Sequence, residues 1–137
     1  MSRRMLPALL AAAAAALSGC GADSADLFAV QRTGDDPNAN VDLVVNDGGT
    51  MACNDGEPIA LPGTRLLDAR DLARRLEAQA ALSIELPPGP RASLRYVVSL
   101  SNGRVAFSDT SEGRPPVFNE LVAFSADVIE NVCKIER

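Results

Sequence analysis

The chain has 137 residues, no histidine, no tryptophan and a formal net charge of −5. The negative charge argues against nucleic acid as a ligand and against electrostatic attachment to anionic lipid. Without histidine the chain lacks the commonest general base and the commonest metal ligand, so the composition predicts a protein that is not an enzyme and holds no cofactor.

The first 19 residues contain the parts of a secretory signal. Arg3 and Arg4 precede an apolar run over residues 6–17, which is shorter than the roughly 20 residues of a membrane-spanning helix. The run ends in Leu17-Ser18-Gly19-Cys20, which resembles the lipobox of bacterial lipoproteins. The resemblance implies that the Cys20 thiol receives a diacylglyceryl group and that cleavage then makes Cys20 the mature N-terminus. The alternative is an ordinary secretory signal with a cysteine near its cleavage site.

Lipidation at Cys20 would place the protein on the extracytoplasmic side of the cell membrane. Two acyl chains give stable anchoring, because each buried methylene contributes about 0.8 kcal/mol. The mature chain would have 118 residues (137 − 19) and a charge of −7 (11 basic minus 18 acidic), which suits one domain. Residues 20–25 are small and polar and predict a tether, and residues 26–137 predict a single domain.

The two remaining cysteines, Cys53 and Cys133, would meet an oxidising compartment after export. An even pair in such a compartment predicts one disulfide. The alternative is a redox or metal site, but the chain has neither a histidine ligand nor the Cys-x-x-Cys spacing.

The hydrophobic pattern of the first half predicts three strands and a helix. The strands are expected over residues 27–32, 41–45 and 50–53, with turn formers between them. The helix is expected from Thr64, as N-cap, to about Gln79, with Asp71 and Arg75 able to pair across one turn.

The second half predicts a hairpin and a second helix. Asn102-Gly103 favours a type I′ turn, which would set Leu100 opposite Val105 and Val98 opposite Phe107. After Pro115-Pro116 a wide apolar stripe predicts a helix to about Ile135, buried against the sheet. The predicted fold class is therefore α+β, an antiparallel sheet of about five strands packed by two helices in the order βββαββα.

Three patterns in the sequence have residue types that can carry chemistry. The first is a partial match to the spacing of a calcium-binding loop, formed by the oxygen-bearing side chains of Asp36, Asn38, Asn40, Asp42 and Asp47. The match fails at two positions, because Val41 replaces the glycine of the sharp turn and the shorter Asp47 replaces the closing glutamate. Serines have no histidine to activate them, and nothing selects one pair among the 18 acids as a glycosidase pair. The sequence therefore predicts neither a metal site nor a catalytic residue.

The element order, with its alanine, arginine and aspartate usage, resembles small lipoproteins of unknown function from high-GC actinobacteria. It is also similar to emfourin-like inhibitors of thermolysin-type metalloproteases. That similarity rests on a tyrosine-containing strand leading to Asn102-Gly103, here Leu94-Arg95-Tyr96-Val97-Val98, and on a helix that opens after prolines, here Pro115-Pro116-Val117. It covers about residues 27–132 and implies the fold, without an inhibitory residue. Export, lipidation and the disulfide depart from that family.

We expect a membrane-anchored, non-catalytic envelope lipoprotein that binds an envelope protein partner. The first alternative is an emfourin-like inhibitor of a secreted metalloprotease. An enzyme would instead require a concave site with a raised carboxylate pKa, and a small-ligand carrier would require a cavity.

Overall fold

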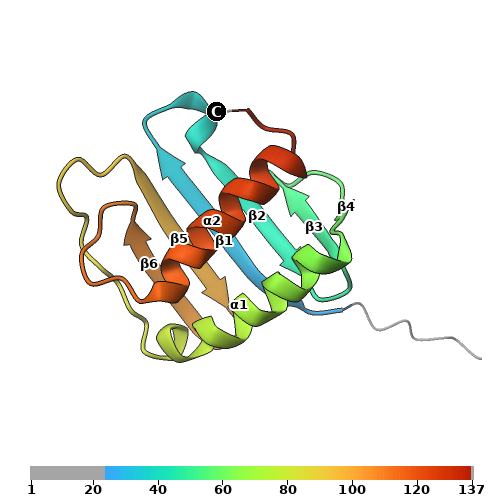
Figure 1. Ribbon diagram of the computed structural model, residues 1–137, viewed down its shortest axis with the longest axis horizontal. Helices are drawn as coiled ribbons and strands as arrows, with labels where there is room; N and C mark the ends of the chain where they lie inside the picture. The colour runs from blue at the N-terminus through green and yellow to red at the C-terminus, as the bar shows by residue number, and fades with distance from the viewer. Residues whose placement is uncertain (1–23, 137) are drawn as a thin grey trace, which may run out of the picture.

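Six antiparallel strands form one sheet, and both helices lie on the same face of it (Figure 1). The computed structural model describes residues 24–136, so the signal segment and Cys20 lie outside the described residues. The elements in chain order are β1 (Asp26–Gly34), the 3-10 helix η1 (Pro37–Ala39), β2 (Val41–Asn46), β3 (Thr50–Cys53), β4 (Ile59–Ala60), α1 (Gly63–Ala81), β5 (Leu94–Leu100), β6 (Gly103–Ser108) and α2 (Pro116–Asn131).

The predicted α+β class is confirmed, and the predicted strand count is corrected by one. The additional strand is β4, whose two residues pair with Thr50 and Met51 of β3. It is too short to show a period of two, so the hydrophobic pattern does not reveal it. The strand order is β4-β3-β2-β1-β5-β6, which places β1 in the interior of the sheet, paired with both β2 and β5.

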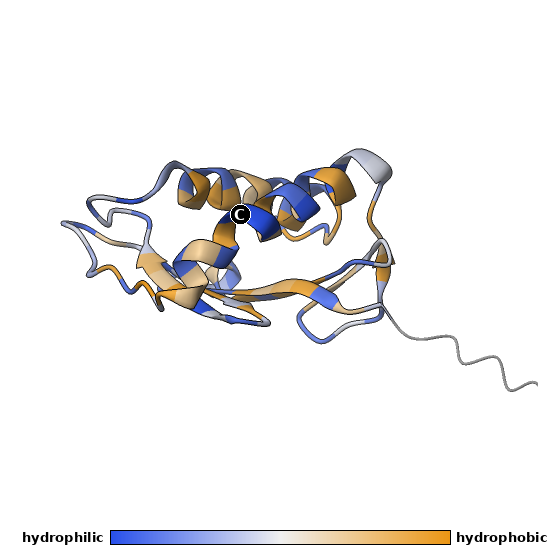
Figure 2. Cartoon of the chain, turned by 90° about the horizontal axis from the view of Figure 1, so that it is seen from below, coloured by the Kyte–Doolittle hydropathy of each residue, from blue (hydrophilic) through white to orange (hydrophobic). Residues whose placement is uncertain are grey.

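The core lies between the sheet and the two helices (Figure 2). Alternate residues of the strands point into it, among them Phe28 and Val30 of β1. Both helices contribute their predicted apolar positions, which are Ala69, Leu72, Ala73, Leu76 and Ala80 of α1 and Val117, Leu121, Phe124 and Val128 of α2. Because the apolar period matches the helix period, each helix buries one face.

The hairpin of β5 and β6 has a different register from the predicted one. Leu100 pairs with Gly103 and Val98 with Val105, so the prediction is wrong by two residues. The turn is held by α1: the Asn102 amide donates to the Glu77 carbonyl at 3.0 Å, and a Cβ on Gly103 would lie 2.2 Å from the Ala80 carbonyl oxygen. Because of this close approach, only glycine fits at position 103. Gly103 pairs with Leu100 as the first residue of β6, whereas the prediction placed it in the turn. A shift by two keeps the same faces inward, so the predicted core face is retained.

The start of α1 also differs from the prediction. The helix begins at Gly63 with Pro62 in the N-cap position, and no side chain caps it, so Thr64 is not the cap. The Leu66 amide donates to the Pro62 carbonyl at 3.0 Å, so the N-cap lies two residues earlier than expected.

The second helix ends at Asn131, four residues before the predicted end. Lys134 has a φ of 58° and reverses the chain, and the Ile135 amide then donates to the Ile129 carbonyl at 3.0 Å. Ile135 still packs against the core. The chain reversal after α2, and not a further helical turn, brings this apolar side chain there.

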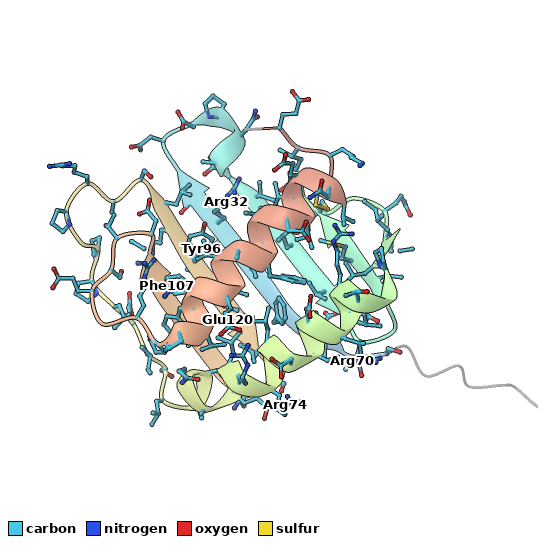
Figure 3. All side chains as sticks on the ribbon, in the orientation of Figure 1. Arg32, Arg70, Arg74, Tyr96, Phe107 and Glu120 are labelled. Carbon is cyan, nitrogen blue, oxygen red and sulfur yellow. A yellow bond between two sulfur atoms is a disulfide. The ribbon has the colours of Figure 1, made fainter. Side chains whose placement is uncertain are left out.

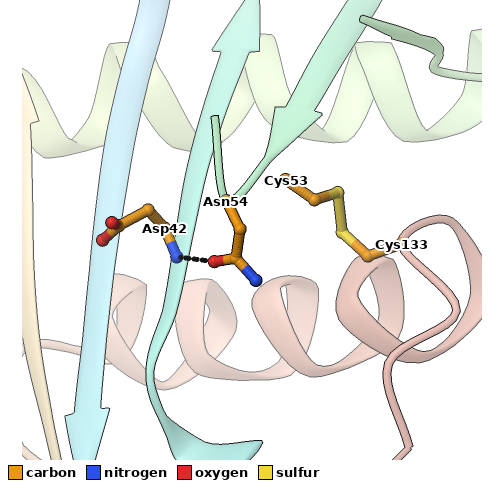
Figure 4. The surroundings of a disulfide bond; sticks show 4 residues. All are labelled: Asp42, Cys53, Asn54 and Cys133. Atoms are coloured by element: carbon orange, nitrogen blue, oxygen red, sulfur yellow. Dashed lines mark hydrogen bonds between the residues drawn. A yellow bond between two sulfur atoms is a disulfide. The ribbon is translucent and has the colours of Figure 1, made fainter. Parts of the chain in front are cut away.

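A disulfide joins Cys53 at the end of β3 to Cys133 beyond α2, with Cα atoms 6.0 Å apart (Figure 4). This agrees with the pairing expected from the sequence. The turn after Cys53 is tied to β2, because the Asp42 amide donates to Asn54 Oδ1 at 2.9 Å and the Asn54 amide donates to the Asp42 carbonyl at 2.8 Å. Asn54 and Asp55 both have positive φ, as the central residues of a type I′ turn do.

None of the helices within residues 24–136 has the length and apolar character needed to cross a bilayer.

Candidate functional site

A cleft of about 280 Å³ opens where β1 ends and β5 begins, beside α2. Arg32 and Tyr96 are register partners on the inward face of the sheet, and both line the cleft (Figure 3). The other lining residues are the apolar Leu94, Val122, Ala126 and Ala39 and the polar Asp35, Asp36, Asn38, Ser93 and Asp109. The cleft therefore combines apolar walls with one cation and three carboxylates.

The guanidinium of Arg32 is the most unusual group in this cleft, because the residue is only 7% exposed. Its Nε donates to the Ala39 carbonyl at 2.9 Å, and one terminal nitrogen donates to the Asn38 carbonyl at 3.0 Å. No carboxylate within residues 24–136 forms an ion pair with it. A buried charge with only neutral partners is costly, so a carbonyl or carboxylate oxygen that reaches the guanidinium itself would be stabilised, against the repulsion of the three carboxylates that line the same cleft.

The same two hydrogen bonds explain why the loop after β1 folds as it does. Arg32 binds the last carbonyls of η1, which have no partner within so short a helix. A Cβ on Gly34 would lie 2.6 Å from the Ser93 carbonyl oxygen, so glycine lets the chain leave β1 close to β5. Together these contacts set the width of the cleft.

Asp109 is the carboxylate at the other side of the cleft. Burial favours its neutral form, but hydrogen bonds from Ser93 Oγ at 2.7 Å and from the backbone amides of Ser93, Leu94 and Thr110 outweigh burial and lower the Asp109 pKa. A carboxyl group with a lowered pKa stays ionised at neutral pH. It suits charged contacts and is a poor general acid or base.

The lowered pKa of Asp109 predicts an effect on acid stability. Its favourable contribution is complete above the unfolded pKa of about 3.9 and is lost as the pH falls through the lower folded pKa. We expect Asp109→Asn to reduce the difference in unfolding free energy between about pH 7 and about pH 3. Urea titrations at both pH values would measure it, with Glu112→Asn, an exposed acid in the same loop, as control. Equal pH dependence in both variants would contradict the assignment.

The calcium-loop candidates do not come together in the structure; they are Asp36, Asn38, Asn40, Asp42 and Asp47. Asp47 Oδ1 accepts from Arg70 at 2.7 Å, Asn38 donates to the Glu136 carbonyl at 3.1 Å, and Asn40 accepts from the backbone of β1. Within residues 24–136 no group of three His, Cys, Asp or Glu side chains has a metal-binding arrangement. Their spacing reflects a loop and a strand that separate the side chains.

Arginines of α1 bind carboxylates of α2, which the sequence pattern did not reveal. Arg65 Nε lies 2.7 Å from Asp127, and Arg75 contacts Glu120 as well as its predicted partner Asp71, at 2.8 Å. The side-chain bonds from these arginines lower the pKa of Glu120 and of Asp127. Water screens such exposed pairs, so they contribute little to the stability of the fold.

No family model matches this chain, and no curated protein or solved structure is significantly similar to it.

Of the calcium-loop candidates, Asp36 and Asn38 line this cleft, but the sequence did not point to Arg32, Ser93 or Asp109 as parts of a site. Only one signal was available: Arg32 continues the inward alternation of Phe28 and Val30, where a charged residue is unusual. Asp109 and Ser93 give no signal, because their contact depends on how β5 and β6 pair.

Proposed function

We propose that this protein is a membrane-anchored envelope lipoprotein that acts as a non-catalytic binding module, with the Arg32 cleft as its binding site. The observation that supports this most directly is a guanidinium that is buried, lines a cleft and binds only backbone carbonyls. A partner that inserts an acidic or carbonyl-rich group beside an apolar one would complement Arg32, Leu94 and Val122.

The chemistry of the surrounding carboxylates favours binding over catalysis. Asp109 lines the cleft and its pKa is shifted downward; outside the cleft, the pKa shifts of Glu120 and Asp127 are also downward. General acids and bases at neutral pH have the opposite property, a pKa raised toward 7. The cleft therefore suits a partner that is held by charge and apolar contact.

Two alanines of α2 provide a matched test of the cleft. Ala126 lines it, whereas Ala123, one turn away, lies on the side that faces α1. We expect Ala126→Arg to fill the cleft and abolish enrichment of the partner that the wild-type domain captures from envelope extract. Ala123→Arg should leave enrichment unchanged, with both variants melting like the wild type. Equal enrichment by all three proteins would show that binding does not use the cleft.

The anchor has its own test, because it depends on Cys20. We expect Cys20→Ala to yield an unprocessed or released protein that no longer sediments with membranes. Labelling with a radioactive fatty acid should mark the wild type alone. Normal processing and labelling of Cys20→Ala would contradict lipidation at this residue.

The second proposal, an emfourin-like inhibitor of a secreted metalloprotease, is favoured by one observation. The strands and helices that carry the resemblance occur in the predicted order, with β4 added. Inhibition should then be complete at saturating domain and be lost when the surface that blocks the protease is altered. Full protease activity at saturating domain would remove this proposal without affecting the first.

A further inference from the structure

The exposed side of α1 carries apolar and basic side chains in a single row, which we call the α1 stripe. It consists of Leu67, Arg70, Arg74, Ala78 and Leu82, at spacings of three and four. Leu67 and Leu82 are 64% and 76% exposed, the highest values among the large apolar side chains of the described residues. Residues at these spacings lie on one face of a helix, so the stripe runs along its length.

The chain enters the fold next to this stripe. The Ser24 carbonyl accepts from the side-chain amide of Asn46 at 2.6 Å, and the Ala25 carbonyl accepts from the backbone amide of Asp47 at 2.9 Å. Asp47 in turn accepts from Arg70 of the stripe at 2.7 Å through its carboxylate. Hydrogen bonds therefore connect the first described residues to α1 through one turn.

The far end of α1 is fixed to the same end of the sheet. Asn102, in the turn between β5 and β6, donates to the Glu77 carbonyl, and Gly103 lies against Ala80. The helix thus crosses the ends of the strands on the side where the chain enters (Figure 1).

Only four residue steps separate Ser24 from Cys20. Four steps of extended chain span at most about 14 Å. A lipid at Cys20 would therefore hold this end of the domain at the membrane surface. Within α1 the charges sum to +1 (four arginines minus three carboxylates), against −7 for the mature chain, so an anionic surface repels α1 less than it repels the domain as a whole.

We propose that the α1 stripe lies on the phospholipid headgroups and sets the orientation of the domain on the membrane. This rests on the proposed lipid anchor at Cys20. The leucines insert between headgroups, and the stems of Arg70 and Arg74 lie along them. Their guanidinium groups are also bound to Asp47 and Asp71, respectively, at the edge of the stripe. The Arg32 cleft lies at the other end of β1, whose nine residues span roughly 30 Å, so it faces away from the bilayer.

The chain contains no tryptophan, so a single introduced tryptophan reports its own surroundings. The experiment uses the full-length protein processed by its host and reconstituted into vesicles of phosphatidylethanolamine and phosphatidylglycerol, with or without brominated acyl chains. We expect brominated lipid to quench the emission of Leu67→Trp and Leu82→Trp. Ala92→Trp, an exposed site at the cleft end, should keep its emission and be quenched by aqueous iodide.

Vesicle flotation separates failure of the anchor from failure of the orientation. If the protein floats but brominated lipid quenches Leu67→Trp no more than Ala92→Trp, the anchor stands and the orientation is wrong. If the protein does not float, the anchor and the orientation that depends on it are both wrong. If Leu67→Trp emission is blue-shifted without lipid and indifferent to brominated lipid, the stripe binds protein, which also overturns the proposal.

Discussion

Reduction of the Cys53–Cys133 disulfide is expected to lower the free energy of unfolding by about 4 kcal/mol. The two cysteines are 80 residues apart, and the bridge encloses β4, α1, β5, β6 and α2. Without it the unfolded chain regains the entropy of that long loop, whereas the folded domain keeps its core. For a domain of this size the loss corresponds to a decrease in Tm of about 15 °C.

Calorimetry with and without reductant would measure this decrease. The double variant Cys53→Ser, Cys133→Ser should melt at the temperature of the reduced wild type and be unaffected by reductant. A wild-type Tm that reductant does not change would show that the protein forms no bridge. The matched variant also separates the bridge from any general effect of the reductant.

The parts of the fold that the sequence predicted are those decided by local periodicity. Leu72 and Leu76 of α1, and Leu121 and Val128 of α2, repeat at helical spacing, and all four are buried. The disulfide followed from counting cysteines in a chain that the sequence predicts to be exported. Each of these inferences depends on a short window or on composition, and neither requires knowledge of how distant segments meet.

The errors arose where tertiary contacts override a local preference. Asn102-Gly103 has the composition of a type I′ turn, yet contacts with Glu77 and Ala80 of α1 shift the hairpin. Two residues with positive φ, as that turn type requires, occur instead at Asn54-Asp55. A turn motif states which backbone conformations are accessible, and packing then selects among them.

The cleft could not be predicted for a related reason. Its residues come from β1, the segment around η1, the start of β5, the loop after β6 and α2. Arg32 alone carries a signal in the sequence, a charge at an inward strand position. That signal indicates a buried arginine without showing that Val122 and Ala126 leave space beside it. A site assembled from five segments is visible only once their packing is known.

Phe118→Ala is expected to lower the free energy of unfolding by about 4 kcal/mol. Phe118 is fully buried, and its ring stacks on Phe107 with centroids 4.6 Å apart. Phe107 stacks in turn on Tyr96 at 5.3 Å, so three rings connect α2, β6 and β5. Truncation removes both the burial and one partner of this stack. Urea denaturation would measure the loss, and Phe118→Leu, which fills most of the space, should lose about 1 kcal/mol.

The same substitution should also affect the cleft, because Tyr96 lines it. Phe124→Ala is the matched comparison: Phe124 packs edge-on against Phe28 at 6.0 Å, outside the three-ring stack and outside the set of cleft residues. Both variants should lose similar stability, but only Phe118→Ala should weaken capture of the wild-type partner under conditions where both remain folded. Equal loss of capture would mean that binding depends on overall stability rather than on the position of Tyr96.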